Sequence, residues 1–345
     1  MNKIQNAAKV LILSAPTDLH AITVGEHLTS MGISYKIWRL EDFLKRCTLR
    51  FSLDDRSGCA AVTLDDGDSI VLNELASIWF RRPGAPRSMA MPEPWIERMM
   101  EQEANSLLGG MLRSAHCLMV NHPGKDTECL HKIWQLEAAK RVGLLIPDTI
   151  VTNDPATAGD FVAQHNGKVI YKFIGENANR LFPQSEMAIG IPTVQFREKD
   201  NQHLDQVKYG PHLFQRSIEK RFEVRVTAIG QKLFAGRIES QAISSAGKTD
   251  WRLDYSVPME VYKLPDEIAG QCLKLLELLG LNYGAIDFCV DDEGNHVFLE
   301  CNCAGQYLWL ERKTDMPISA ELARLLAGQG EPIIPPFSTY DRAAL

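Results

Sequence analysis

The sequence YGAIDFCVDDEGNHVFLECNCAGQYLWLE, residues 283–311, decides the fold. Two runs within it, 285–290 and 296–302, have the alternating pattern of strands. The short segment between them is rich in Asp, Gly and Asn, which is the usual composition of a tight turn. The stretch therefore predicts a β-hairpin with a two-residue turn centred on Glu293 and Gly294.

This hairpin would bring three oxygen-bearing side chains to one face. Asp287 stands opposite Glu300 in the predicted register, with Cβ atoms about 5 Å apart, and Asn302 returns to the same face two residues later. Opposed carboxylates repel unless something neutralises them. Hard oxygen ligands suit Mg²⁺ completed by water and phosphates, whereas a solvated surface hairpin is the alternative. The core would take the other face: Ile286, Phe288, Val290, Val297, Leu299 and Cys301.

Composition and charge limit the classes of function. The chain has 345 residues, of which 45% are hydrophobic and 23% charged, so it predicts a globular protein of two or three domains. Its formal charge of −7 disfavours a general binder of nucleic acid. The sequence contains no apolar run of about 18 residues that would predict a membrane span. The first residues lack a signal-peptide pattern, so we expect a cytoplasmic protein.

The eight cysteines are scattered along the chain, and many lie in apolar runs. In a reducing compartment they should be free, buried thiols. Cys301 and Cys303 could contribute to a zinc site, but no second pair or nearby histidine completes the set of ligands.

The first 120 residues alternate apolar strand runs with helical spacing, which predicts an α/β lobe. One of its strands, 77–80, ends in Arg81 and Arg82. The two arginines could receive a carboxylate or an acidic peptide through bidentate contacts. They could equally be a solvated strand end, and both interpretations stay open.

The pattern of Asp287 followed by Glu300-x-Asn302 resembles the metal-binding strands of the ATP-grasp enzymes. The segment FLECNCAGQYLWLE, 298–311, looks most like the microviridin-type (graspetide) ligases that form ester or amide cross-links in ribosomal peptides. Those enzymes have Asn-Pro-x-Gly-Gln where this chain has Asn-Cys-Ala-Gly-Gln at 302–306. The missing proline should alter the turn and leave the ligands in place.

The resemblance covers about residues 75–325 and implies an α/β (α+β) fold of the ATP-grasp type. Residues 1–120 would form the N-terminal α/β lobe. Residues 121–215 and 216–330 would form two α+β lobes that clasp the nucleotide, the second with the magnesium site. Residues 331–345 would be a tail.

The resemblance also implies a set of nucleotide contacts. Two lysines match positions that reach the phosphates, the crossover between lobes would supply groups to adenine, and an acidic residue would bind ribose. For Lys132 the alternative is a solvated lysine on a helix surface, and for the crossover it is an edge strand whose charges alternate for solubility. The implied nucleotide-binding residues are Lys132, Lys172, Gln215, Ser217, Ile218 and Glu223.

Several charged residues would surround the reacting groups. Arg225, Arg237 and Glu239 are expected to line one surface, and a flexible loop leads to Asp250 and Arg252 in a segment that the graspetide ligases share as Asp-Trp-Arg. Arginines beside a metal would offset the charge of ATP and of an acyl phosphate. The resemblance therefore implies Arg225, Arg237, Asp250 and Arg252 as catalytic residues.

The activity implied is that of an ATP-dependent ligase that requires ATP and Mg²⁺. A substrate carboxylate would attack the γ-phosphate, and a hydroxyl or amine would capture the acyl phosphate. The first hypothesis is a macrocyclase that joins Asp or Glu to Ser, Thr or Lys side chains of a ribosomal precursor peptide, with a leader and an acidic core. The second is a ligase that adds an amino acid to a protein or small-molecule carboxylate. The third is a nucleotide-binding regulator without turnover. A homodimer is left open.

Overall fold

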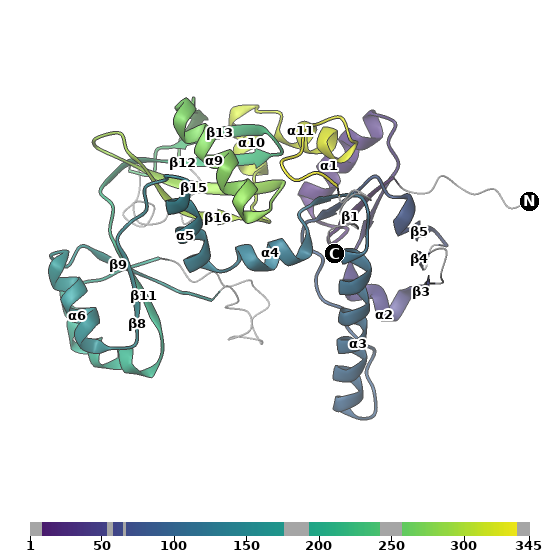
Figure 1. Ribbon diagram of the computed structural model, residues 1–345, viewed down its shortest axis with the longest axis horizontal. Coiled ribbons are helices and arrows are strands. Elements are labelled where there is room, and N and C mark those ends of the chain that lie inside the picture. The colour runs from purple at the N-terminus through teal and green to yellow at the C-terminus, as the bar shows by residue number, and fades with distance from the viewer. Residues whose placement is uncertain (1–8, 54–57, 65–66, 176–192, 242–256, 337–345) are drawn as a thin grey trace, which may run out of the picture.

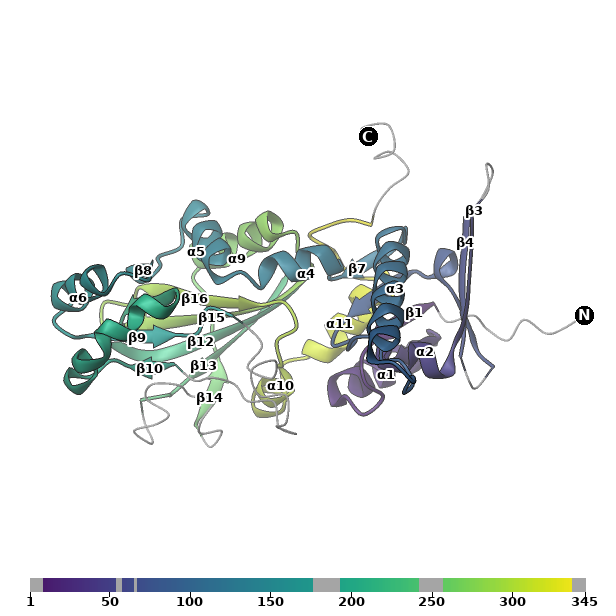
Figure 2. The ribbon, with the colours of Figure 1, turned by 90° about the horizontal axis from the view of Figure 1, so that it is seen from below.

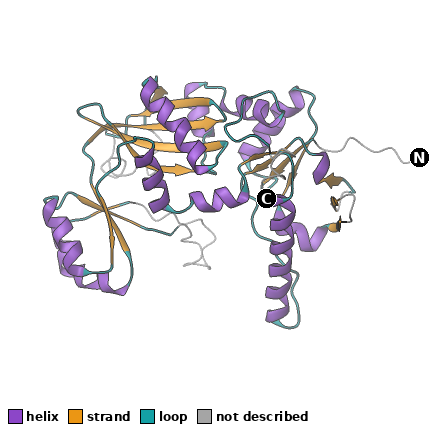
Figure 3. Ribbon diagram, in the orientation of Figure 1, coloured by secondary structure: helices purple, strands orange, loops and turns teal. Residues whose placement is uncertain are grey.

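The computed structural model describes residues 9–53, 58–64, 67–175, 193–241 and 257–336. Their strands form four sheets, and helices pack against the sheets in a mixed α/β arrangement (Figure 1, Figure 3). The α/β class predicted from the sequence is confirmed. No helix among the described residues is long and apolar enough to cross a bilayer.

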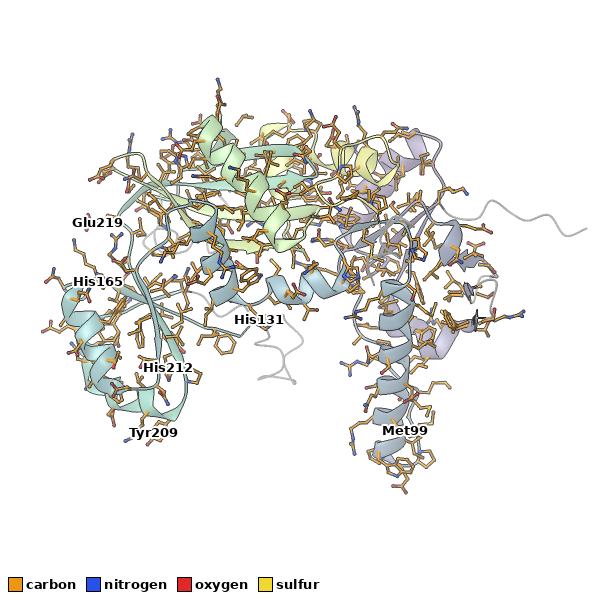
Figure 4. The ribbon with its side chains drawn as sticks, viewed as in Figure 1. Met99, His131, His165, Tyr209, His212 and Glu219 are labelled. Carbon is orange, nitrogen blue, oxygen red and sulfur yellow. The ribbon has the colours of Figure 1, made fainter. Side chains whose placement is uncertain are left out.

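A parallel sheet in the order β2-β1-β6-β7 organises the N-terminal part. Strand β1 is entirely buried because parallel sheets are covered on both faces. One face packs on α1, and the other packs on α3 and the β3-β4-β5 sheet. Helix α3 extends away from the lobe, with Met99 near its far end (Figure 4). The elements are β1 (Val10–Leu13), α1 (Leu19–Ser30), β2 (Tyr35–Trp38), η1 (Leu40–Asp42), α2 (Phe43–Arg46), β3 (Thr48–Leu53), β4 (Gly58–Thr63), β5 (Ser69–Val71), η2 (Leu72–Glu74), β6 (Ser77–Phe80), α3 (Pro94–Arg113) and β7 (Leu118–Val120).

A second, antiparallel sheet has the order β10-β9-β11-β8 and stands to one side of the molecule (Figure 1). Its apolar face packs on α6 through Phe161, Val169 and Phe214. The residues at alternate positions therefore lie on the opposite face of this small sheet. Its elements are β8 (Thr149–Thr152), α6 (Pro155–Gln164), β9 (Val169–Lys172), β10 (Val194–Gln195), η3 (Glu198–Tyr209) and β11 (His212–Arg216).

The largest sheet has five strands in the order β14-β13-β12-β15-β16. Helices α5 and α9 cover its apolar face, as Figure 2 shows from below. Helix α9 ends at Gly280, whose φ of 74° suits a glycine at a helix C-terminus. The elements are α4 (Pro123–Cys129), α5 (Lys132–Arg141), β12 (Lys220–Ile229), β13 (Lys232–Ile238), β14 (Met259–Val261), α9 (Asp266–Leu279), β15 (Tyr283–Asp291) and β16 (His296–Asn302).

Two features differ from the sequence interpretation. The stretch 121–145, which we grouped with the central lobe, packs on the five-stranded sheet: Cys129, Leu136 and Ala139 belong to that core. In the same stretch, the helical spacing of Leu130, Ile133 and Leu136 after Asp126 predicts one helix that stops at Gly143. The structure has two helices instead, because α4 ends at Cys129 and α5 begins at Lys132.

The last helices connect the five-stranded sheet to the N-terminal lobe. They are α10 (Leu308–Thr314) and α11 (Ile318–Leu326). Leu322 of α11 shares a core with Val24 of α1 and Trp79 of β6. The end of the chain therefore completes the apolar packing of its beginning.

Candidate active site

The face of the five-stranded sheet that is not covered by α5 and α9 carries a grid of polar side chains. Strand pairing places Arg225 beside Asp287 and Asp287 beside Glu300. In the next row, Thr227 lies beside Ala285 and Ala285 beside Asn302. Alternation along each strand puts both rows on one side. We call this surface the polar face; it comprises Glu223, Arg225, Thr227, Asp287, Glu300 and Asn302.

The predicted pairing of Asp287 with Glu300 is confirmed, but the turn is different. Asp291 and Asn295 close a three-residue loop in which Gly294 has a φ of 87°. That loop alone would shift the register by one residue. A β-bulge compensates, because Phe288 pairs with Phe298 while Asp287 pairs with Glu300 and leaves Leu299 unpaired.

Between the turn and the bulge, the residues of β16 that face the core differ from those predicted. Phe298 belongs to the core with Phe288 and Cys301. Val297 pairs with Cys289 instead, and Leu299 is only partly buried. The prediction that Val297 and Leu299 face the core was therefore wrong, because it assumed an uninterrupted ladder.

Arg225 is the central cation of the polar face. Its Nη1 donates to Asp287 Oδ2 at 2.6 Å and its Nη2 to the carbonyl of Gln306 at 3.1 Å. Only 5% of the residue is exposed, and burial acts to lower the pKa of its guanidinium, yet the charge of Asp287 raises that pKa overall. Arg225 is therefore a permanent cation that already relieves part of the repulsion between Asp287 and Glu300.

Glu223 lies one row further along β12. Lys220 Nζ donates to Glu223 Oε1 at 2.7 Å. Burial raises the pKa of Glu223, although Lys220 opposes this shift. The carboxyl group therefore sits in a low-dielectric pocket beside a cation.

The small sheet contributes Lys172 and Gln215 from the face opposite α6. Leu213 pairs with Lys172 and Gln215 pairs with Ile170, so alternation places both polar side chains on that face. Burial raises the pKa of Cys289, next to Asp287 on β15, to about 12, and the charge of Lys172 opposes this rise. Lys172 is therefore within electrostatic reach of the polar face.

The other residues predicted to contact the nucleotide are Ser217, Ile218 and Lys132, and the structure relates them less directly to the polar face. Ser217 follows β11; its N–H donates to the Lys168 carbonyl at 2.8 Å, and Ile218 is partly buried beside it. Lys132 is the first residue of α5. Within the described part of the chain, no hydrogen bond or ion pair joins Lys132 to the polar face.

The expectation that Arg237 shares a surface with Arg225 was wrong. Arg237 pairs with Val224, so it lies on the opposite side of the sheet. Its guanidinium lies 4.0 Å from the ring centroid of Phe222 and pairs with Glu239 at 2.5 Å. Asp250 and Arg252 lie outside the described residues.

The polar face fits a magnesium ion in its donor chemistry. Among the described residues, no group of three His, Cys, Asp or Glu side chains is arranged to hold a metal. The available donors are the two carboxylates and the amide of Asn302, whose Nδ2 lies 3.1 Å from Glu300 Oε1. Two carboxylates with room for phosphates and water are a typical Mg²⁺ set. In the described part, Arg225 Nε and Thr227 Oγ1 are also buried without a hydrogen-bond partner.

Sequence reasoning missed the side chains that hold the loop after β16. Arg81 and His20 of the N-terminal lobe, and Asn121 directly after its last strand β7, bond to the backbone of residues 303–308. The position of Arg81 after a strand was the only signal. Arg81 is buried, so it is not a solvated strand end, whereas Arg82 is exposed.

Solved structures with the same fold cover nearly the whole chain. A RiPP-associated ATP-grasp ligase from Chryseobacterium gregarium, in complex with ADP and a leader and core peptide, superposes with a TM-score of 0.83 at 26% identity, covering 96% of this chain and 100% of that one. The chain has the fold of the ATP-grasp ligases. The macrocyclase MdnC of Microcystis aeruginosa MRC, bound with the precursor peptide MdnA, gives a TM-score of 0.79 at 25% identity, with coverage of 93% and 99%.

Curated relatives of this chain are more distant in sequence. Beta-citrylglutamate synthase B of Danio rerio is 19% identical over 252 residues, which is 68% of this chain and 55% of the relative. N-acetylaspartylglutamate synthase A of Homo sapiens is 19% identical over 234 residues, 61% of this chain and 53% of the relative. The chain thus spans about half the length of these curated relatives. No family model matches the sequence.

Proposed function

We propose that this ATP-grasp ligase is a peptide macrocyclase that joins Asp or Glu side chains of a ribosomal precursor peptide to Ser, Thr or Lys side chains. Its similarity to a RiPP-associated ATP-grasp ligase and to a macrocyclase bound with its precursor peptide, over 93–96% of the chain, carries the proposal. The polar face supports it, because that surface combines two opposed carboxylates with a buried arginine.

The residues of the polar face and of the small sheet would have separate roles in binding magnesium and the nucleotide. Asp287, Glu300 and Asn302 would hold magnesium, which supplies charge neutralisation at the nucleotide phosphates. Lys172 would bind the phosphates from the small sheet, and Glu223 would accept hydrogen bonds from the ribose. Gln215, Ser217 and Ile218 would line the adenine site.

The reaction has two steps. A carboxylate oxygen of the peptide forms a bond to the γ-phosphorus while the bond to ADP breaks, which yields an acyl phosphate. A hydroxyl or amine of the same peptide then attacks the acyl carbon, loses its proton and expels inorganic phosphate. Arg225, which donates to Asp287, would hold that carboxylate in place beside the reacting phosphates.

A ligase that adds an amino acid is the second candidate, because both curated relatives are synthases of glutamate conjugates. Product mass separates the two functions. Each ring removes the mass of one water from the peptide, whereas ligation adds the mass of an amino acid residue. The assay incubates the protein, ATP, Mg²⁺ and candidate acidic peptides, and follows peptide mass and ADP.

The matched variants are Asp287→Asn and Glu300→Gln, which remove one charge each and preserve shape. We expect both to reduce Mg²⁺-dependent ADP formation by about a hundredfold or more. Alanine at position 287 is a poorer choice, since it would leave Arg225 buried without its carboxylate, which costs about 3–5 kcal/mol. Full turnover in either folded variant would remove the metal assignment. A peptide whose mass never decreases, with ADP still formed, would exclude the macrocyclase.

A further inference from the structure

The loop that follows β16, residues 303–307, is held by side chains from the N-terminal lobe. Arg81 Nη1 donates to the carbonyls of Ala304 and, at 3.1 Å, Gly305. His20 Nε2 accepts from the Tyr307 N–H at 3.1 Å. We call residues 303–307 the anchored loop, because two side chains far away in the sequence, one directly after β6 and one in α1, fix its backbone.

A third contact comes from the end of β7. Asn121 Nδ2 donates to the carbonyls of Tyr283 at 2.9 Å and Cys303 at 3.2 Å. Its Oδ1 accepts from the N–H groups of Asn282 and Tyr283, both at 2.8 Å. The start of β15 and the start of the anchored loop are thus joined to the same side chain.

The side chains that anchor the loop are buried, and they are held by a charged neighbour. Arg81 is 2% exposed, and its Nε lies 3.4 Å from Asp18 Oδ2. Asp18 Oδ1 lies 3.3 Å from His20 Nδ1, and Ser14 Oγ donates to Asp18 at 2.7 Å. Burial lowers the pKa of His20, so its Nε2 carries a lone pair and can accept from the loop.

The opposite side of the anchored loop touches the polar face. The carbonyl of Gln306 accepts from Arg225 Nη2, and the other terminal nitrogen of Arg225 binds Asp287. Gly305 lies directly on the sheet: a Cβ there would be 2.3 Å from Ala285 Cβ and 2.8 Å from Arg225 Nη2. Movement of the loop would therefore move Arg225, and with it Asp287.

We propose that Arg81, supported by Asp18 and His20, is a positioning residue that fixes the anchored loop and so sets the orientation of the magnesium-binding carboxylate Asp287. This inference rests on the proposed function of the polar face. It assigns a role to the N-terminal lobe in the geometry of the nucleotide site, although Arg81 itself touches neither nucleotide nor peptide.

The competing explanation is that Arg81 only holds the lobes together. Stability would then change without a change in how the protein responds to magnesium. The decisive measurement is equilibrium binding of ADP by calorimetry, with and without Mg²⁺, because it does not depend on turnover. The protein is used as the full chain, and folding of each variant is verified by circular dichroism and thermal unfolding.

In Arg81→Met we expect the gain in ADP affinity conferred by Mg²⁺ to fall about tenfold, the usual effect of removing a group that orients a metal ligand. ADP affinity without Mg²⁺ should be unchanged. Arg81→Lys retains a donor and should recover part of the effect. For ring formation, kcat should fall while the KM for peptide is preserved.

Arg39→Gln is the matched control. Arg39 follows the neighbouring strand β2, and its Nε donates to Asp42 at 2.9 Å, so the variant breaks an arginine–carboxylate pair at the same edge of the sheet. This variant should respond to Mg²⁺ as the parent does. Gly305→Ala leaves the side chains of Arg81, His20 and Asn121 unchanged but displaces the loop from the sheet. It should lose the Mg²⁺ effect and decides the question if Arg81→Met does not fold.

A normal Mg²⁺ effect in folded Arg81→Met, or in Gly305→Ala when Arg81→Met is unfolded, overturns the inference. Asp287→Asn in the same assay distinguishes failure of the proposed metal site from failure of the positioning role of Arg81. If Asp287→Asn also keeps the Mg²⁺ effect, the proposed metal site fails as a whole. If Asp287→Asn loses the effect and Arg81→Met keeps it, only the positioning role fails.

Discussion

The contact of Arg225 with Asp287 changes how the facing carboxylates Asp287 and Glu300 are interpreted. From the sequence, Asp287 opposite Glu300 required a cation, and a metal was the candidate. The structure supplies a second cation, since Arg225 binds Asp287 at 2.6 Å from the adjacent strand. The charge of the pair is thus partly balanced before any metal binds, and the negative charge of Glu300 also acts on Arg225.

Asp126, next to the anchored loop, gives a prediction at the residue scale. Burial raises the pKa of its carboxyl group to about 6, above the value of about 3.9 in an unfolded chain. Between about pH 4 and 6 the native state therefore binds more protons than the unfolded state, and stability falls as the pH rises through this window. Asp126→Asn removes the penalty, so it should be more stable than the parent by about 1–3 kcal/mol at pH 8.

Urea unfolding at pH 4 and pH 8 tests this. The difference between Asp126→Asn and the parent should be large at pH 8 and nearly absent at pH 4. Glu128→Gln is the control, because Glu128 is exposed on the same helix and pairs only with Lys125 among the described contacts. An equal difference at both pH values would show that the substitution acts through packing and not through the charge.

What the sequence could predict is clearest from individual residues. Asp287, Glu300 and Asn302 were placed on one face because alternation and pairing are local rules. Arg237 was misplaced because its face depends on the register of β12 with β13, which the sequence does not fix there. The role of Arg81 depends on contacts 223 and 224 residues away, and no local pattern encodes them.

At the scale of elements, the hairpin β15–β16 shows how two local irregularities cancel. The three-residue loop at 292–294 and the bulge at Leu299 each shift the register by one residue, and together they restore the pairing of Asp287 with Glu300. A hairpin with a two-residue turn and no bulge also pairs Asp287 with Glu300, so this pair alone does not distinguish the two arrangements. The residues between turn and bulge do, because Val297 and Phe298 face opposite sides in the two arrangements.

Deletion of Leu299 tests the purpose of the bulge. Without it, Phe288 can still pair with Phe298 and Asp287 with Glu300, so we expect a folded protein. The local bend would be lost, because bulges increase twist and re-aim adjacent side chains. A shift of about 1 Å at Glu300 should reduce Mg²⁺-dependent ADP formation by up to about a hundredfold.

Leu299→Ala is the control for this deletion, since it shortens the side chain and keeps the bulge. Thermal unfolding and ADP formation are measured on both. Activity close to the parent in the deletion variant would mean that the bulge has no part in aiming Glu300. Failure of the deletion variant to fold, with Leu299→Ala folded, would contradict the pairing expected without the bulge.

At the scale of the whole molecule, the N-terminal lobe and the five-stranded sheet act as one body. They share a core in which α11 packs with α1, and Arg81, His20 and Asn121 bond across the same junction. The small sheet has its own core with α6. Figure 1 shows it standing beside the large sheet. Residues 217–219 connect its strand β11 to β12 of the large sheet.

A nucleotide that contacts Lys172 and Gln215 on the small sheet and Glu223 and Asp287 on the large one must bind both bodies at once. Mg²⁺ and ADP should therefore slow hydrogen exchange in both regions. At a ligand concentration of about 100 times Kd the stabilisation is about 2.7 kcal/mol, so amides that exchange through separation of the sheets should slow by about a hundredfold. The amides to follow by mass spectrometry are those of 169–172, 212–218 and 285–290. In Asp287→Asn the protection should be lost in the presence of Mg²⁺, and protection confined to one sheet in the parent would show that the two sheets do not close on a shared nucleotide.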